Sequence, residues 1–411
     1  MILGSFTTGK NITDDKLWEM MKRANDLTQG DDFSGWAANS LTLLPLLKRI
    51  LARAREVKDW QVYFYVMSRA FWYIGWDEVD DPRFAFQMSE MFQQANVWHL
   101  AEETTRLGRE SYVECAARIL HLYMQYPQID DAKMQQMLTI FLESDEKYGT
   151  DWNKGSYDNI MLAALFERDL FLAGKAKKKL ESLDFTGWCY VCYYVRPMLG
   201  YYVYVEDYDS MEELILRVAR KEIAKKYQWC YDQCEQANEG TLVTEALRYC
   251  MDFGKVELFQ KIFEKWGDLF KHPMTGGIST CGAMLHAFAS DLSRMEETLQ
   301  VAEEDDRKRK AKKITPYDEM YWFLWWHFYF RLLEKQGVKS VNIRLAEETE
   351  ASEEYKTGGE VSKDGRRSCS CRDLSTYFVE KADAVGWQMS RSRKKFDYEK
   401  IKESHKICLG L

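Results

Sequence analysis

The clearest helical pattern of the chain is WQVYFYVMSRAFWYIGWDEVDDPRFAFQMSEMF, residues 60–92. Its apolar residues recur at steps of four and three, which places them on one face of a helix. A turn through WDEVDD follows, and Asp81-Pro82 then supplies a capping carboxylate and a proline at a first helical position. A second apolar face runs from Phe84 to Ala95. The stretch therefore predicts two antiparallel helices joined by a short turn.

The same order of helix, turn and returning helix recurs along the chain. Turns near residues 127, 174 and 254 bracket further helix pairs. Proline is scarce, with six residues in 411, which favours helices over a sheet-rich fold of this length. We therefore predict an all-α protein of stacked antiparallel helical hairpins. The predicted helix starts include Ser111, Ser210 with Glu213, and Thr315 with Pro316.

One of these pairs is similar to a known repeat family. The segment TLVTEALRYCMDFGKVELFQKIFEKW, residues 241–266, resembles the tetratricopeptide-type hairpin in its small residue, glycine turn and aromatic return helix. Residues 70–92 resemble it more loosely. The resemblance covers about residues 55–270, although the repeats are less regular than that family's period of about 34 residues. It implies an α-solenoid, an architecture that presents an extended concave surface to peptide or protein partners.

Composition shifts divide the chain into two predicted regions. Residues 1–300 form the expected helical-repeat array, and residues 301–411 form a C-terminal helical region that begins with a charged connector. Residues 346–368 are polar and predict a loop. Just before them, Val341, Ile343 and Leu345 alternate with polar residues, which is the period of a strand. We expect a short strand or hairpin near residues 339–370.

Charge and hydropathy limit the classes of protein to which the chain can belong. Its net charge is −8, whereas a general nucleic-acid binder is normally basic. No apolar run reaches the ~20 residues that span a bilayer, and the first residues lack the order of a secretory signal. We therefore expect a cytoplasmic protein with reduced thiols, which binds neither nucleic acid nor membrane.

Cysteine forms the sharpest chemical pattern. Cys189 and Cys192 lie in WCYVCYY, and Cys230 and Cys234 lie in QWCYDQC. Four thiolates paired at short spacing could bind zinc in a tetrahedral site, and WCxxC also resembles a redox motif. The favoured interpretation is packing, because small apolar thiols at helical spacing are among the most buried residues. We thus predict no metal and no cofactor, with the four-cysteine zinc site as the alternative.

Two predicted helices each carry more aromatic residues than one buried face can hold. Neighbouring residues on a helix point about 100° apart, so some aromatic side chains must face a groove, a second layer or water. Tyr and Trp combine a large contact area with a polar group, which suits partner surfaces. The candidate partner-binding residues are Tyr193, Tyr194, Arg196, Tyr201, Tyr204, Trp322 and Trp326.

Enzyme motifs are missing from the sequence. Gly254-Lys255 lacks the rest of a phosphate loop, and there is no dinucleotide fingerprint or nucleophile elbow. The leading hypothesis is a non-enzymatic helical-repeat scaffold that binds a peptide or protein, in a regulatory or toxin-neutralising role. The alternatives are a zinc-stabilised helical protein and an enzyme whose site is assembled from distant residues. The sequence does not predict the oligomeric state.

Overall fold

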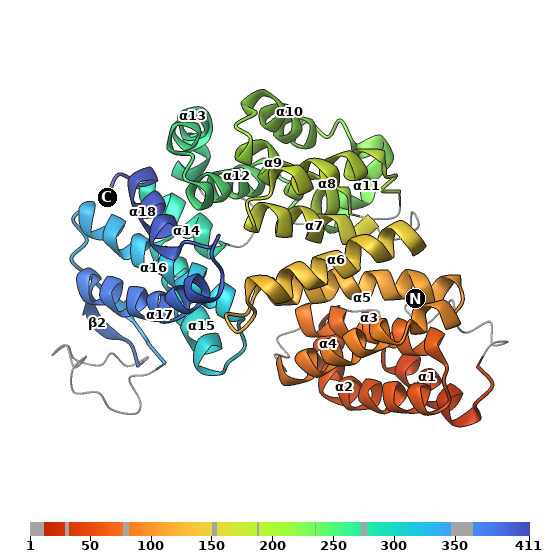
Figure 1. Cartoon of the computed structure of the whole chain (residues 1–411). Helices are drawn as coiled ribbons and strands as arrows, with labels where there is room; N and C mark the ends of the chain where they lie inside the picture. Colours follow the sequence, from red (N-terminus) through yellow and green to blue (C-terminus); the bar gives the residue numbers. More distant parts are fainter. Residues whose placement is uncertain are drawn as a thin grey trace. The chain divides into compact units, whose positions relative to one another are not determined.

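The computed structural model describes residues 12–28, 33–76, 82–149, 154–186, 189–234, 236–272, 278–346 and 365–411. Most of these residues are helical, as the sequence predicts, and one small antiparallel sheet accompanies the helices (Figure 1). The chain divides into two compact units. Unit 1 comprises Met1–Met124 and Ala132–Asn159, and unit 2 comprises Gln125–Asp131 and Ile160–Leu411. This division lies elsewhere than the predicted boundary at residue 300.

Unit 1 is built from helices around a mixed aliphatic and aromatic core. Helix α3 packs against α2 and α5, and α1 packs against α2. Phe64 on α3 meets the ring of Tyr112 on α5 edge-on, at 5.0 Å between centroids, and Phe92 on α4 stacks on Tyr112 at 4.7 Å. The elements that begin in this part of the chain are α1 (Asp15–Thr28), α2 (Phe33–Glu56), α3 (Trp60–Trp76), α4 (Pro82–Val97), η1 (Leu100–Glu103), α5 (Arg106–Met124), α6 (Asp131–Tyr148) and α7 (Lys154–Phe166).

Unit 2 contains the remaining elements. Before residue 272 these are α8 (Leu170–Ser182), the π-helical turn η3 (Val191–Val195), α9 (Arg196–Tyr204), α10 (Tyr208–Ala219), α11 (Ala224–Gln233), α12 (Glu239–Phe253), α13 (Val256–Trp266) and η4 (Gly267–Lys271). After it come α14 (Thr280–Phe288), α15 (Met295–Lys310), α16 (Pro316–Lys335), β1 (Ser340–Ile343), β2 (Arg367–Ser370), α17 (Cys371–Ser392) and α18 (Tyr398–Cys408).

Helix α12 lies at the centre of unit 2, where it contacts α9, α13 and α18. Its approach to α9 is close at Gly200, where an added Cβ would lie 2.9 Å from the Tyr249 ring and from Leu165. A glycine there lets the two helices pack without displacing the tyrosine. Helices α16 and α17 lie side by side and pack along their lengths, and α16 also contacts α14 (Figure 1).

The predicted pairing of helices is clearest for α12 and α13, which contact each other. Gly254 ends α12 with a φ of +71°, the left-handed conformation that favours glycine, and Lys255 N–H donates to the Cys250 carbonyl across the turn. Thr315 caps α16, where its Oγ1 accepts a hydrogen bond from Asp318 N–H. Pro316 is the first residue of that helix, as predicted.

The predicted hairpin near residues 339–370 is confirmed. Strands β1 and β2 pair in antiparallel register, with Val341 opposite Cys369 and Ile343 opposite Arg367. Val341 and Ile343 are buried and alternate with exposed residues, as the period of two predicts. Most of the predicted polar loop at 346–368 and the predicted turn at residues 77–81 lie outside the described residues.

Three predicted helix boundaries are wrong. The turn near Gly174 does not exist, since α8 runs through that glycine, and the chain instead turns at Arg168, whose φ is +53°. Ser111 lies buried inside α5 and caps nothing. Asp207 caps α10 in place of Ser210, because its carboxylate accepts the Ser210 N–H at 3.1 Å.

Candidate metal centre

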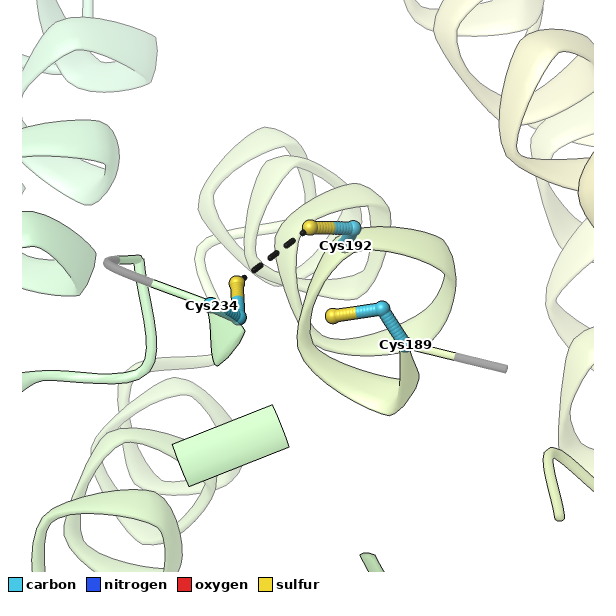
Figure 2. A group of neighbouring side chains, drawn as sticks. All are labelled: Cys189, Cys192 and Cys234. Carbon is cyan, nitrogen blue, oxygen red and sulfur yellow. Dashed lines mark hydrogen bonds between the residues drawn. The ribbon is translucent and has the colours of Figure 1, made fainter. Parts of the chain in front are cut away.

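Two pairs of cysteines approach each other within unit 2. Cys189 directly precedes the helical run of η3 and α9, and Cys192 lies in η3. Cys230 lies in the last turn of α11, and Cys234 follows that helix with an extended backbone. The side chains of Cys189, Cys192 and Cys234 turn toward a common space between the two segments (Figure 2). The fold therefore brings together two cysteine pairs that lie about forty positions apart in the sequence.

The sulfur spacing resembles that of a tetrahedral metal site. The Sγ atoms of Cys189, Cys192 and Cys234 all lie within 4.8 Å of one another, and Cys192 Sγ lies 3.6 Å from Cys234 Sγ. Four Zn–S bonds of about 2.3 Å place neighbouring sulfurs about 3.8 Å apart in a tetrahedron. In the described part of the chain, no other group of three His, Cys, Asp or Glu residues meets this spacing.

Cys230 lies beside these thiols, although its sulfur is not one of the three that all approach within 4.8 Å of one another. Its side chain is fully buried, and its Sγ accepts the Tyr190 N–H at 3.2 Å. Interaction with the Cys189 thiol lowers the pKa of Cys230 to about 6, although burial opposes this shift. The pKa of Cys189 is raised, chiefly by its interactions with the thiols of Cys192, Cys230 and Cys234. The four thiols therefore influence one another electrostatically, and the hydrogen-bonded pair among them is Cys192 and Cys234.

Negative charge is favoured on Cys234. Interactions with the thiols of Cys189 and then Cys192 lower its pKa to about 3, and the backbone N–H groups of Gln236 and Ala237 act in the same direction. Backbone N–H donors of this kind also stabilise metal-bound thiolates, since they compensate charge on sulfur. The donors around the cluster therefore suit thiolate ligands.

Arg196 lies beside the cysteines. Its Nη1 donates to Gln236 Oε1 at 2.9 Å, and its Nη2 donates to Glu245 Oε1 at 3.1 Å. Gln236 Oε1 also lies 3.5 Å from Cys192 Sγ. Cys189 lowers the pKa of Cys192, but Cys234 and burial raise it, and the net pKa is about 12. The Arg196 guanidinium opposes this rise. Arg196 thus contributes positive charge next to a site that would be anionic with four thiolates.

The tyrosines proposed as partner contacts are partly exposed. Tyr193, Tyr194, Tyr201 and Tyr204 are all intermediate between buried and exposed. Each of the last three packs one side against neighbours of unit 2: Tyr194 stacks on Tyr190 at 4.7 Å, Tyr201 meets Tyr202, and Tyr204 meets Phe253. The run from η3 through α9 therefore presents a partly exposed tyrosine surface that begins at the cysteine cluster.

The two tryptophan candidates on α16 differ in how deeply they are buried. Trp322 is partly exposed. Trp326 is fully buried, and its Nε1 donates to Asp305 Oδ2 at 2.8 Å, so the structure places it in the core and corrects its assignment to a partner surface. Trp326 is buried because α14, α15 and α17 pack against its helix and α15 supplies its hydrogen-bond acceptor. Thr280 also donates to the same Asp305 oxygen at 2.8 Å.

A cluster of largely buried charged residues on α12 is not predicted from the sequence. Glu245, Arg248 and Asp252 lie at steps of three and four, so they share one face of a largely apolar helix, and this spacing is the signal that could have identified them. Glu245 accepts from Arg248 at 2.6 Å. Asp252 Oδ1 lies 3.4 Å from Nε2 of His405 on α18. Asp252 therefore lies close to a histidine of α18, although its Oδ1 accepts no hydrogen bond from the described residues.

In the described residues, no helix is both long and apolar enough to span a membrane. Comparisons of the chain with protein-family models, with curated proteins and with solved structures find no match.

Proposed function

We propose that unit 2 binds one structural Zn²⁺ ion through Cys189, Cys192, Cys230 and Cys234. The convergence of three thiols within 4.8 Å of one another supports this proposal, and the buried Cys230 beside them would supply the fourth ligand. Thiols that pack only as small apolar side chains have no need to converge from separate segments of the chain. The zinc site, which is the alternative interpretation of the sequence, is therefore the preferred interpretation of these cysteines.

The ligand set determines the kind of metal and its role. Thiolates favour soft or borderline ions, and four of them in a tetrahedral arrangement favour zinc or iron. Four cysteines fill every position of a tetrahedral zinc ion, whereas a catalytic zinc keeps one position for water or substrate. The proposed ion therefore stabilises structure. It would fix the start of the η3–α9 run to the end of α11, around the intervening α10.

Single-cysteine variants test this assignment. Cys230→Ala and Cys234→Ala should each reduce bound zinc from one ion per chain to none and lower the free energy of unfolding. Structural zinc contributes about 10–16 kcal/mol of apparent binding free energy in small domains, so its loss is measurable by chemical denaturation. Cys250→Ala is the matched control, because Cys250 is as fully buried as Cys230 in the same unit.

The control separates zinc binding from ordinary packing. Cys250→Ala should keep one zinc and lose only the modest stability expected for a small buried side chain. Equal effects of all three substitutions, with no zinc in any of the proteins, would show that the four cysteines pack without metal.

A second function, partner binding, is supported by the partly exposed tyrosines next to the centre. We propose that helix pairs of this chain stack in a tetratricopeptide-like manner and bind a peptide or protein, in a regulatory or toxin-neutralising role. Tyr201 and Tyr204 on α9 are the preferred contacts, since each is only partly buried. Trp322 is a further candidate. Arg196 is less suitable, because Gln236 and Glu245 already engage its guanidinium.

A partner identified by cross-linking of the native complex allows this function to be tested. Tyr201→Ala and Tyr204→Ala should weaken its binding by at least ~1 kcal/mol, about a fivefold increase in Kd, while the helical fold is retained. Trp387→Ala serves as the control, because Trp387 is an exposed aromatic residue on α17, far along the chain from α9. Equal binding by all three variants would remove α9 as the contact surface.

A further inference from the structure

The four thiols of the proposed zinc centre differ in their access to solvent. Cys189 and Cys230 are buried, whereas Cys192 and Cys234 are only partly buried. The two accessible thiols are also the pair whose sulfurs lie 3.6 Å apart. A small oxidant dissolved in water therefore reaches the centre at the Cys192–Cys234 edge. The six other cysteines of the chain are buried.

The backbone at this edge allows the two sulfurs to approach further. A disulfide requires an S–S distance of about 2.05 Å, so the sulfurs would have to move about 1.6 Å closer. Cys234 lies beyond the end of α11, with φ −111° and ψ 104°, and its N–H donates to the Cys230 carbonyl at 3.0 Å. Because Cys234 lies outside the helix, α11 can remain intact while the Cys234 side chain rotates toward η3.

We infer that Cys192 and Cys234 form the oxidant-sensitive edge of the zinc centre, where a peroxide converts them to a disulfide and releases the metal. This inference rests on the proposed zinc site. It adds a regulated state to that site, in which the reduced centre holds zinc and the oxidised centre does not. Loss of two of the four sulfur ligands would leave only Cys189 and Cys230, too few to complete a tetrahedral site.

The chemistry balances with hydrogen peroxide as the oxidant. One thiolate of the pair attacks a peroxide oxygen, the O–O bond breaks, and a sulfenic acid and hydroxide form. The second thiolate then attacks the sulfenic sulfur, so that an S–S bond forms and a second hydroxide leaves. The two sulfurs together lose two electrons, peroxide gains them, and two protons convert both hydroxides to water. Zinc leaves as Zn²⁺ with its oxidation state unchanged.

The disulfide joins the same two segments as the metal. Because Cys192 lies in η3 and Cys234 follows α11, the oxidised chain remains cross-linked between them after zinc has left. We therefore expect oxidation to release zinc while most of the helical structure remains. Removal of zinc by a chelator under reducing conditions leaves no such cross-link, and it should destabilise unit 2 more than oxidation does.

The test uses the full chain purified with reductant and loaded with zinc. After removal of the reductant, hydrogen peroxide is added in steps, released zinc is measured with the chromogenic chelator 4-(2-pyridylazo)resorcinol, and disulfide-linked peptides are identified by mass spectrometry. We expect one zinc ion to be released for each Cys192–Cys234 disulfide formed. Dithiothreitol with added zinc should restore the original metal content.

Cys192→His and Cys234→His test the role of the pair, since each supplies a nitrogen ligand in place of one sulfur of the disulfide. A variant that retains zinc should hold it at peroxide doses that empty the unsubstituted protein, and Cys250→Ala should respond like the unsubstituted protein. Zinc release without this disulfide, or a disulfide between other cysteines, would overturn the inference and leave the metal site standing. Absence of zinc from the starting protein would overturn both proposals, even if the disulfide forms.

Discussion

Asp252 shows how burial sets the protonation of a single residue in this protein. Its carboxyl lies in the core between α12 and α18, and burial raises its pKa to about 7, although Arg248 opposes the shift. Its neighbour His405 donates from Nδ1 to the Ile401 carbonyl and accepts the Trp325 indole N–H at Nε2. Burial lowers the pKa of His405 to about 4, so the imidazole is neutral at pH 7.

The raised pKa of Asp252 predicts how stability depends on pH. The unfolded chain has an Asp pKa of about 3.9, so between pH 4 and 7 the folded protein holds a proton that the unfolded chain has lost. Asp252 therefore contributes less stability as pH rises through this window. His405 has the opposite effect, because its folded pKa is lowered, and its contribution is lost as pH falls toward 4. The two effects partly offset each other in the unsubstituted protein.

Asp252→Asn isolates the contribution of the carboxyl. Asparagine resembles the neutral acid and does not titrate, so the variant should be more stable than the parent at pH 8 and similar to it near pH 4. Each unit of pKa shift corresponds to about 1.4 kcal/mol, which chemical denaturation at the two pH values can measure. Glu403→Gln on the exposed face of α18 is the control, and it should show little difference at either pH.

The opposite result is also informative. If Asp252→Asn instead destabilises the protein more at pH 8 than at pH 4, Asp252 is ionised in the folded state and Arg248 stabilises its charge. The raised pKa would then be wrong.

At the level of secondary-structure elements, one buried side chain attaches the segment Gln125–Asp131 to unit 2. Arg393 follows α17 and is fully buried. Its Nε donates to the Ile129 carbonyl at 3.1 Å, and its Nη2 donates to the Tyr126 carbonyl at 2.9 Å. Its guanidinium also lies 4.9 Å from the Phe166 ring centre. These contacts explain why this short segment belongs to unit 2, although its chain neighbours on both sides belong to unit 1.

Substitution of Arg393 should therefore be costly. Arg393→Met keeps the length of the side chain but leaves two buried carbonyls without their donor, at about 1–3 kcal/mol for each unsatisfied group. We expect a loss of about 3 kcal/mol in the free energy of unfolding, and a smaller loss for Arg393→Lys, which can donate to one carbonyl. Arg391→Met is the control, since Arg391 lies two residues earlier and is exposed. Equal stability of the Arg393 and Arg391 variants would contradict this role.

The elements also show what the sequence could and could not predict. Helical periodicity located α3, α12 and α13, because their apolar residues recur on one face, and Thr315 with Pro316 located the start of α16. The turn before α8 was missed, since Arg168 adopts a positive φ that its residue type does not signal. Gly174 was misassigned because a glycine also fits inside a helix, and an added Cβ there would meet nothing within 4 Å.

The cysteine cluster required the tertiary structure. The spacing within each pair fits both a helix and a metal-binding motif, so it could not distinguish packing from ligation. Whether Cys192 meets Cys234 depends on how α11 returns to η3, and the local sequence does not encode this contact. Trp326 was misassigned for a related reason, because an aromatic run predicts that some side chains are exposed without identifying which.

For the molecule as a whole, the cysteine centre, the tyrosine surface of α9 and the cluster of charged residues on α12 all lie in unit 2. Its sequence positions extend from Gln125 to Leu411 with one interruption, and contacts between distant residues hold it together. Ser404 Oγ on α18, for example, donates to the Met251 carbonyl on α12 at 2.7 Å. A metal that fixes η3 to α11 would therefore stabilise one part of unit 2, while contacts such as that between α18 and α12 stabilise another part.

The metal content of the full chain is the measurement on which this proposal depends. Native mass spectrometry of the protein purified under reducing conditions, with elemental analysis of the same sample, should show one zinc ion per chain. Addition of a strong chelator should remove the ion and lower the thermal melting temperature, and added zinc should restore both. A metal-free chain that melts at the same temperature with zinc and with chelator would contradict the proposal, and the four cysteines would then be packing residues alone.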